Sequence, residues 1–249
     1  MLRSERFKKL NPIGISNAST YSKNTREDSL REYLKIQDSI RIIEMSYDKD
    51  GNYAVFIDYN RNSDYYNVFS YLTKVDLNKS DLEYTALELA KFKNRTPELV
   101  RSQLEKNYQD ILGAWMDIES YNNGLYVVSS CDYLRNFIIT DSMFMTRNLD
   151  GPRPFVIDKI QRLSPIWTQM TLKNDTDRII EIDFYLVDKM RDTYIIEENI
   201  DHDKLEAHYM TKVNSARKYD LIEHVCENEV SGIVFDVVNY DKILKKIKK

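Results

Sequence analysis

The sequence predicts an α+β fold in which a helical hairpin block precedes an antiparallel β-rich half of sandwich or barrel type. Two observations lead to this prediction. Helix caps and helical stripes of apolar residues concentrate between residues 63 and 120, and short runs of β-branched and aromatic residues recur after residue 124. The chain also shows no repeat of about 20–50 residues, which disfavours solenoids and propellers.

Residues 1–28 are expected to form an extended basic arm. The arginines and lysines of the first nine residues supply its positive charge, and Pro12 and Gly14 interrupt helix. Residues 16–24 are rich in Ser, Thr and Asn and have no periodicity. An arm of this composition either stays disordered or wraps a neighbouring subunit.

Residues 29–124 are expected to form a helical region with an early β-hairpin. Apolar residues between 40 and 47 lead into Asp48-Lys49-Asp50-Gly51, after which residues 53–59 alternate in the manner of a second strand. The glycine supplies the positive φ that a tight turn requires. This pattern is the clearest hairpin in the chain.

Two helices should follow. Ser80 and Glu83 form a capping box, with the apolar stripe of residues 82–92 behind it. Thr96 and Pro97 start a second helix, whose stripe reaches Ile118 and which is expected to stop at Asn122-Asn123-Gly124. The two helices should pack as an antiparallel pair that buries Trp115 and Tyr108.

Residues 125–249 are expected to form a β-rich domain with a short basic C-terminal tail. The lysines of this tail follow the pattern of a final helical turn. That turn would be either solvated or in contact with phosphate or an acidic partner. The predicted strands are residues 125–130, 136–140, 143–147, 155–162, 167–173, 179–187, 194–197, 209–213, 221–226 and 233–238.

The composition excludes some chemistry. The chain has 6 Gly, 2 Cys and 3 His against 18 Tyr, and no phosphate-binding glycine loop, nucleophile elbow or paired-cysteine zinc motif occurs. Cys131 and Cys226 are expected to be buried thiols in a reducing compartment. The net charge of −4 argues against broad nucleic-acid binding. We expect neither a signal peptide nor a membrane span.

One candidate metal site combines histidines and carboxylates. Such a set could suit zinc or manganese, but its spacing matches no defined ligand pattern, and whether the histidines meet in space stays open. The set comprises Asp201, His202, Asp203, His208, Glu223 and His224.

A second candidate is a magnesium-dependent nuclease centre on one long strand. Glu181 and Asp183 would share a face of that strand, with Asp188 and Lys189 beyond them. Alternating charges on a solvent-exposed face explain these residues more simply. We therefore assign no catalytic, cofactor-binding or metal residue, and we expect that the protein is not an enzyme and needs no cofactor.

The abundance of tyrosine favours an interaction surface, because tyrosine offers a large contact area with a polar tip. Clusters of this kind occur at Asp64-Tyr65-Tyr66, Tyr121-Asn122-Asn123 and Asn239-Tyr240-Asp241. An AT-rich genome could supply part of this tyrosine without any interface.

The chain combines nine basic-rich first residues with a helical middle and a β-rich second half. In this combination it resembles the collar and connector proteins at the head-to-tail junction of small tailed bacteriophages of low-GC Gram-positive bacteria. The resemblance implies a structural virion protein that forms a homo-oligomeric collar or neck ring, binds portal and tail proteins, and lets double-stranded DNA pass during ejection. It would be assembled in the bacterial host cytoplasm. A baseplate or tail-wedge subunit is one alternative, and a metal-dependent nuclease or other small hydrolase is another.

Overall fold

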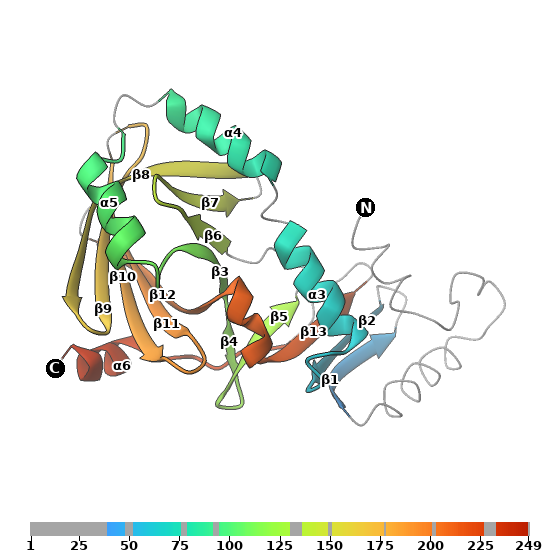
Figure 1. The fold of residues 1–249 in the computed structure, drawn as a ribbon. Helices are drawn as coiled ribbons and strands as arrows, with labels where there is room; N and C mark the ends of the chain where they lie inside the picture. Colours follow the sequence, from blue (N-terminus) through green and yellow to red (C-terminus); the bar gives the residue numbers. More distant parts are fainter. Residues whose placement is uncertain are drawn as a thin grey trace. The chain divides into compact units, whose positions relative to one another are not determined.

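The computed structural model describes residues 39–47, 52–75, 79–91, 95–129, 136–148, 151–176, 178–200, 203–226 and 233–248. They form an α+β fold with a large antiparallel β-rich part (Figure 1), as the sequence predicts. The chain divides into two compact units that interleave along the sequence. The sheet unit takes its described residues from Met1–Leu72, Glu119–Leu134 and Arg217–Asp236, and the barrel unit takes them from Thr73–Ile118, Arg135–Ala216 and Val237–Lys249.

The consecutive segments 1–28, 29–124 and 125–249 expected from the sequence do not coincide with these units. The expected basic arm lies outside the described residues. So do the turn at residues 48–51 and Cys131.

The sheet unit contains five described strands in the order β1-β2-β13-β5-β4. The early hairpin is confirmed, since β1 and β2 pair in antiparallel register from Ile40↔Asp58 to Tyr47↔Asn52. β13 then pairs antiparallel with β2 and parallel with β5. The strands are β1 (Ile40–Tyr47), β2 (Asn52–Asp58), β4 (Glu119–Tyr121), β5 (Gly124–Ser129) and β13 (Asp220–Cys226).

Both faces of this sheet are covered, so β2 is buried from Ala54 to Asp58. Helix α3 (Asp64–Val75) covers one face, where Tyr65 meets Phe56 edge-on at 4.9 Å. Tyr66 on the same helix donates its hydroxyl to the Tyr219 carbonyl at 3.0 Å. A second cluster on the sheet joins Val55, Ile57, Val128 and Ile222 to Ile233 and Phe235 of the segment 233–239.

The barrel unit is a closed antiparallel barrel of eight described strands in the order β10-β11-β12-β3-β6-β7-β8-β9. Seven of the eight follow the chain in sequence, and the earlier strand β3 closes the barrel between β12 and β6. The strands are β3 (Gly113–Asp117), β6 (Asn136–Ile139), β7 (Phe144–Asn148), β8 (Gly151–Ser164), β9 (Trp167–Lys173), β10 (Ile179–Asp188), β11 (Thr193–Ile200) and β12 (Asp203–Lys212).

A hydrophobic core with many aromatic rings fills the barrel. Trp115 is fully buried at its centre, stacked on Phe137 at 5.9 Å and edge-on to Tyr194 at 4.9 Å. Helix α5 (Glu98–Asn107) adds Val100 and Leu104 to the same core. The interior is therefore packed with side chains, as in other barrels of this size.

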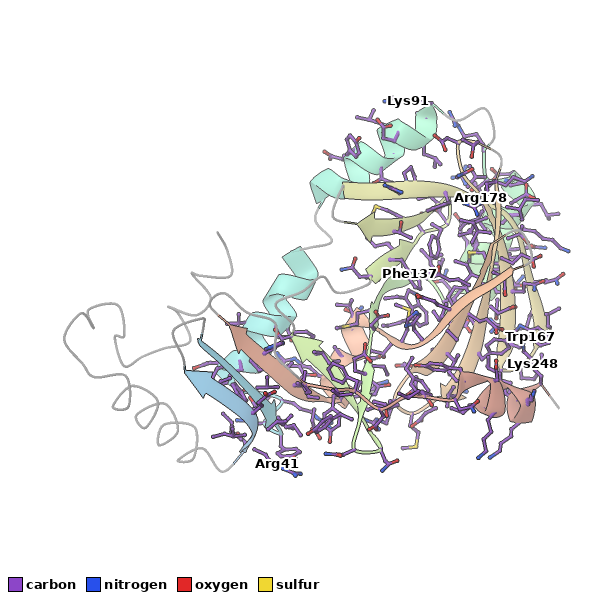
Figure 2. All side chains as sticks on the ribbon, turned by 180° about the vertical axis from the view of Figure 1, so that it is seen from behind. Arg41, Lys91, Phe137, Trp167, Arg178 and Lys248 are labelled. Atoms are coloured by element: carbon purple, nitrogen blue, oxygen red, sulfur yellow. The ribbon has the colours of Figure 1, made fainter. Side chains whose placement is uncertain are left out.

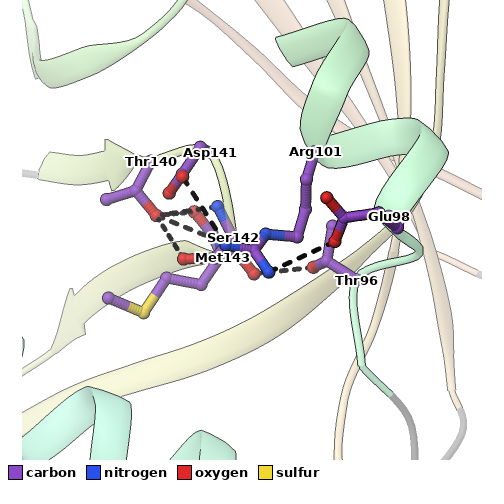
Figure 3. A network of polar contacts seen from close by, with 7 residues as sticks. All are labelled: Thr96, Glu98, Arg101, Thr140, Asp141, Ser142 and Met143. Atoms are coloured by element: carbon purple, nitrogen blue, oxygen red, sulfur yellow. Dashed lines mark hydrogen bonds and ion pairs between the residues drawn. The ribbon is translucent and has the colours of Figure 1, made fainter. Parts of the chain in front are cut away.

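The helices α4 (Lys79–Ala90) and α5 both pack on β8. Figure 3 shows how the start of α5 is held. Thr96 donates its hydroxyl to the Ser142 carbonyl at 2.6 Å and accepts from the Ile157 amide at 3.1 Å. On the first turn of α5, Arg101 lies 3.5 Å from Glu98 and 3.9 Å from Asp141.

The predicted helix from Pro97 to about Ile118 is wrong in its second half. The helix ends at Asn107, and Trp115 lies on strand β3, buried as expected but inside the barrel. Asn122 and Asn123, with φ of 49° and 62°, turn the chain between β4 and β5 and do not end a helix. Paired asparagines before glycine are a hairpin signal, because both central residues of such a turn need positive φ.

The predicted strand at residues 233–238 is also wrong, since residues 233–239 have no regular structure. This segment runs beside β4 and donates one amide, that of Asp236, to the Ser120 carbonyl at 2.8 Å. The Asp236 carboxylate accepts from the Ser120 hydroxyl and from the Asn122 and Asn123 amides. These contacts occupy hydrogen-bonding groups at the edge of β4, which would otherwise invite pairing with another chain.

The C-terminal basic segment forms helix α6 (Tyr240–Ile247), which Asn239 caps by accepting from the Lys242 amide. The helix packs on the outer face of the barrel, where Leu244 is buried with Tyr185 and Ile195. The predicted final helical turn is thus confirmed, and its apolar side covers strands β9 to β12.

Candidate functional site

The structure divides the candidate metal set between the two units. His208 lies on β12 of the barrel with its Nε2 3.0 Å from the Glu206 carboxylate, whereas Glu223 and His224 are buried on β13 of the sheet unit. Asp201 and His202 lie outside the described residues, and the side chain of Asp203 does too. Among the residues that are described, no three His, Cys, Asp or Glu side chains form a group that could hold a metal ion.

The candidate acidic set on β10 also separates. Asp188 accepts from the Met190 and Arg191 amides at 2.8 and 3.2 Å and so shapes the following turn, in which Lys189 is exposed. Glu181 is half-buried on the strand. Asp183 is only 5% exposed, so the interpretation of its charge as part of a solvent-exposed face is wrong.

Asp183 lies directly opposite a second buried carboxylate. The register of β10 and β11 pairs Asp183 with Glu197, which is 6% exposed. Like charges at directly opposed strand positions destabilise a sheet, and burial removes the water that would screen them. Two buried acids in this position therefore need partners that offset their charge.

Neighbouring side chains on the same outer face of the barrel supply hydrogen bonds to both acids. Trp167 donates its indole Nε1–H to Asp183 at 2.7 Å, and Gln169 donates to the same oxygen at 3.3 Å. The Tyr185 hydroxyl donates to Glu197 at 3.3 Å. The two acids are therefore fixed by residues of β9 and β10.

A cation reaches this pair from the end of α6. Lys248 Nζ lies 3.2 Å from a Glu197 carboxylate oxygen. The same ammonium lies over two aromatic rings, 5.5 Å from the centre of Trp167 and 4.9 Å from the centre of Tyr185. Figure 2 shows Trp167 and Lys248 next to each other. We call Trp167, Asp183, Tyr185 and Glu197 the lysine cage.

The electrostatics of the lysine cage reflect its burial. Burial raises the pKa of Asp183, and the Glu197 carboxylate adds to the rise, while the Trp167 hydrogen bond and the Lys248 charge oppose it. Burial and the two carboxylates also raise the pKa of Tyr185, so its hydroxyl remains a donor at neutral pH. The arrangement is suited to holding a cation.

Sequence reasoning missed three members of this site, Trp167, Tyr185 and Glu197, together with their occupant Lys248. The sequence did contain a signal that these side chains share the outer face of the barrel. The odd-numbered residues of β9, β10 and β11 alternate with the apolar residues that fill the barrel interior. No sequence signal could align these strands or bring the C-terminal lysine onto them.

A second feature with functional potential is the outward face of α4. The helix buries Thr85 and Leu89 against the barrel, yet Tyr84 and Leu87 are 52% and 67% exposed. Ala86 and Ala90 are exposed beside them, and a Glu88–Lys91 ion pair borders the surface. We call Tyr84, Ala86, Leu87 and Ala90 the α4 outer surface.

None of the helices in the described part of the chain is both long and apolar enough to cross a membrane. No protein-family model, curated protein or solved structure matches this chain.

Proposed function

We propose that the protein is a structural, non-catalytic subunit that assembles with copies of itself into a ring. The observation that carries the proposal is the α4 outer surface, which presents Leu87 and Tyr84 to solvent on a helix whose other side already packs on the barrel. Burying such side chains against a second protein is favourable, since aromatic and aliphatic residues dominate the centres of interfaces.

The ring we propose is the collar or neck of a small tailed bacteriophage, part of the virion and assembled in the host cytoplasm. The resemblance implies that helices contact portal proteins and that β structure contributes to the tail side. A ring requires heterologous contacts, so the α4 outer surface would meet a different patch on the next copy.

DNA would pass through the central opening of the ring. The inside of each barrel is occupied by Trp115 and its aromatic neighbours, and it has no room for a duplex. The net charge of −4 is compatible with passage, because a weakly acidic wall repels phosphate and does not retain the genome.

Electron microscopy and native mass spectrometry of the purified full chain, alone and with portal protein, test the proposal. We expect closed rings, and we expect Leu87→Asp to weaken association at least about 30-fold because it places a charge in the contact. Met190→Asp is the matched control, since Met190 is 86% exposed on the β10–β11 turn. A chain that stays monomeric even with portal protein would overturn the proposal.

Other outcomes identify the alternatives. Rings or wedges organised around a different axis, seen only with tail proteins, would indicate a baseplate or tail-wedge subunit. Incubation with plasmid DNA and Mg²⁺ or Mn²⁺ should leave the plasmid intact. Metal-dependent cleavage that Asp183→Ala abolishes would instead establish a nuclease.

A further inference from the structure

The lysine cage has the construction of a binding site for an organic ammonium group. A cation near the face of Trp or Tyr is attracted by the ring quadrupole, and a carboxylate in contact with it adds charge attraction. Lys248 receives all three contacts from Trp167, Tyr185 and Glu197.

The walls of the cage are held independently of Lys248. The rings of Trp167 and Tyr185 lie 5.5 Å apart at an angle of 31°, and the two residues are register partners on β9 and β10. The hydrogen bonds Trp167 to Asp183 and Tyr185 to Glu197 fix the ring orientations. Because adjacent barrel strands carry all four residues, the site is preorganised for a ligand.

The occupant is held more loosely than the walls. Lys248 follows the last residue of α6, and its side chain is 38% exposed, against 8% for Glu197. Helix α6 is anchored to the barrel by Tyr240, Ile243, Leu244 and Ile247. The Lys248 side chain can therefore leave the cage while the helix stays docked.

We propose that the lysine cage is a binding site for alkylammonium groups, as carried by lysine side chains and their methylated forms, and that Lys248 occupies it as an intramolecular competitor. This inference does not depend on ring formation.

Competition by a tethered group sets the expected affinities. A group held by a short connection reaches an effective concentration on the order of millimolar or more, so a free ligand must displace Lys248. The apparent association constant is the intrinsic one multiplied by the fraction of chains whose site is empty. Removing the Lys248 ammonium should thus tighten binding of an added alkylammonium ion about tenfold or more.

Titration of the full-length chain with choline, at constant ionic strength, tests the proposal. The readout is the indole N–H resonance of Trp167, identified by its loss in Trp167→Phe. The other tryptophan, Trp115, is fully buried in the barrel and serves as an internal control. We expect a saturable shift of the Trp167 resonance alone, weak in the wild type and about tenfold tighter in Lys248→Ala.

Two matched controls separate the cage from general effects. Lys246→Ala removes an exposed lysine of α6 and should retain the weak affinity of the wild type. The neutral isostere of choline, 3,3-dimethylbutan-1-ol, should give no saturable shift.

A further variant tests the cage itself. Glu197→Gln in the Lys248→Ala background should weaken choline binding about tenfold, because it removes the negative charge of the carboxylate.

Lys248→Gln is the second variant, in case Lys248→Ala disturbs α6, and it should bind choline like Lys248→Ala. The proposal is overturned if neither Lys248 variant shows saturable binding. It is also overturned if the neutral isostere binds equally well, or if Trp115 shifts in parallel with Trp167.

Discussion

At the scale of single residues, Lys248 brings a positive charge to two buried acids that face each other across a strand pair. Asp183 and Glu197 are both more than nine-tenths buried, and each has hydrogen-bond donors from Trp167, Gln169 or Tyr185. Donors orient a carboxylate and lower the cost of its charge without cancelling the repulsion between the two acids. Repulsion between the two acids therefore lowers the stability of the folded barrel at this position.

Replacing Asp183 with asparagine should reveal that cost. Burial raises the pKa of Asp183, so the folded state retains this proton more strongly than the unfolded state. The resulting stabilisation is present below the ordinary pKa of aspartate and is lost as pH rises through the raised value. Asp183→Asn stays neutral and can still accept from Trp167, so its free energy of unfolding relative to wild type should increase from pH 4 to pH 7.

Urea unfolding at the two pH values measures this difference. Asp175→Asn, at an exposed position in the β9–β10 turn, is the matched control, and the rise in relative stability between the two pH values should be larger for Asp183→Asn than for this control. A relative stability of Asp183→Asn that falls as pH rises would contradict the prediction.

Trp115 contributes at the residue scale through packing. Its side chain is fully buried, contacts Phe137, Phe184 and Tyr194, and donates its indole N–H to the Ile111 carbonyl at 2.9 Å. Trp115→Ala should lower the free energy of unfolding by about 3–5 kcal/mol, because it leaves a large cavity. Met190→Ala, at an 86% exposed position, should change it by less than about 0.5 kcal/mol in the same denaturation experiment.

At the scale of elements, one hydroxyl joins the start of α5 to two separate parts of the barrel. Thr96 is 6% exposed, and its hydroxyl bonds to the Ser142 carbonyl in the β6–β7 turn (Figure 3). The same oxygen accepts from the Ile157 amide of β8. Since α5 contributes Val100 and Leu104 to the core, the position of Thr96 helps to set how that helix packs.

Thr96→Val keeps the shape of the side chain and removes the hydroxyl. We expect a loss of about 1–3 kcal/mol in unfolding free energy, because the Ile157 amide and the Ser142 carbonyl lose a partner. Chemical denaturation measures the loss, with Thr176→Val in the exposed β9–β10 turn as the control. Thr176 donates its hydroxyl to Asn174 at 2.8 Å, so equal effects of the two substitutions would show that the buried bridge contributes no more than an exposed hydrogen bond.

Strands with alternating patterns and clear turns could be predicted from the sequence. The β1–β2 hairpin is confirmed, and β9 has the predicted bounds. The error around Trp115 has a physical cause: Ile111, Trp115 and Ile118 are spaced for a helical stripe, and all three are buried, but tertiary packing places Trp115 in a strand. Gly113, at φ 113°, marks the conformation that a helix would not allow.

The lysine cage could not be predicted for a different reason. Asp183 was recognisable as a candidate, but its role depends on β11 lying beside β10 and on α6 returning to the same face. Such non-local pairing depends on the register of whole strands. Local composition does not encode it.

At the scale of the whole molecule, the chain passes repeatedly between its two units. Each unit is built from three separate stretches of sequence, so neither corresponds to one continuous segment. The barrel needs β3 from before residue 118 as well as the strands after residue 135.

A fragment of residues 125–249 should therefore fail to fold. It lacks β3 and α5, so its barrel would have an open edge between β12 and β6 and would lose Trp115 from the core. We expect unfolded or aggregated protein by circular dichroism and one-dimensional NMR. Residues 73–249 include every described barrel element and should give more dispersed methyl signals. A fragment of 125–249 with native dispersion would contradict the expected dependence on β3.

The position of β13 also bears on how the protein can be made on the ribosome. The strand fits between β2 and β5, but Asp220 is translated long after Asp58. At about 5–20 residues per second, synthesis of the intervening chain takes roughly 10–30 s. Throughout that interval the edge of the nascent β1–β2 hairpin that β13 will cover lacks this partner, so its backbone groups are open to pairing with strands of other nascent chains.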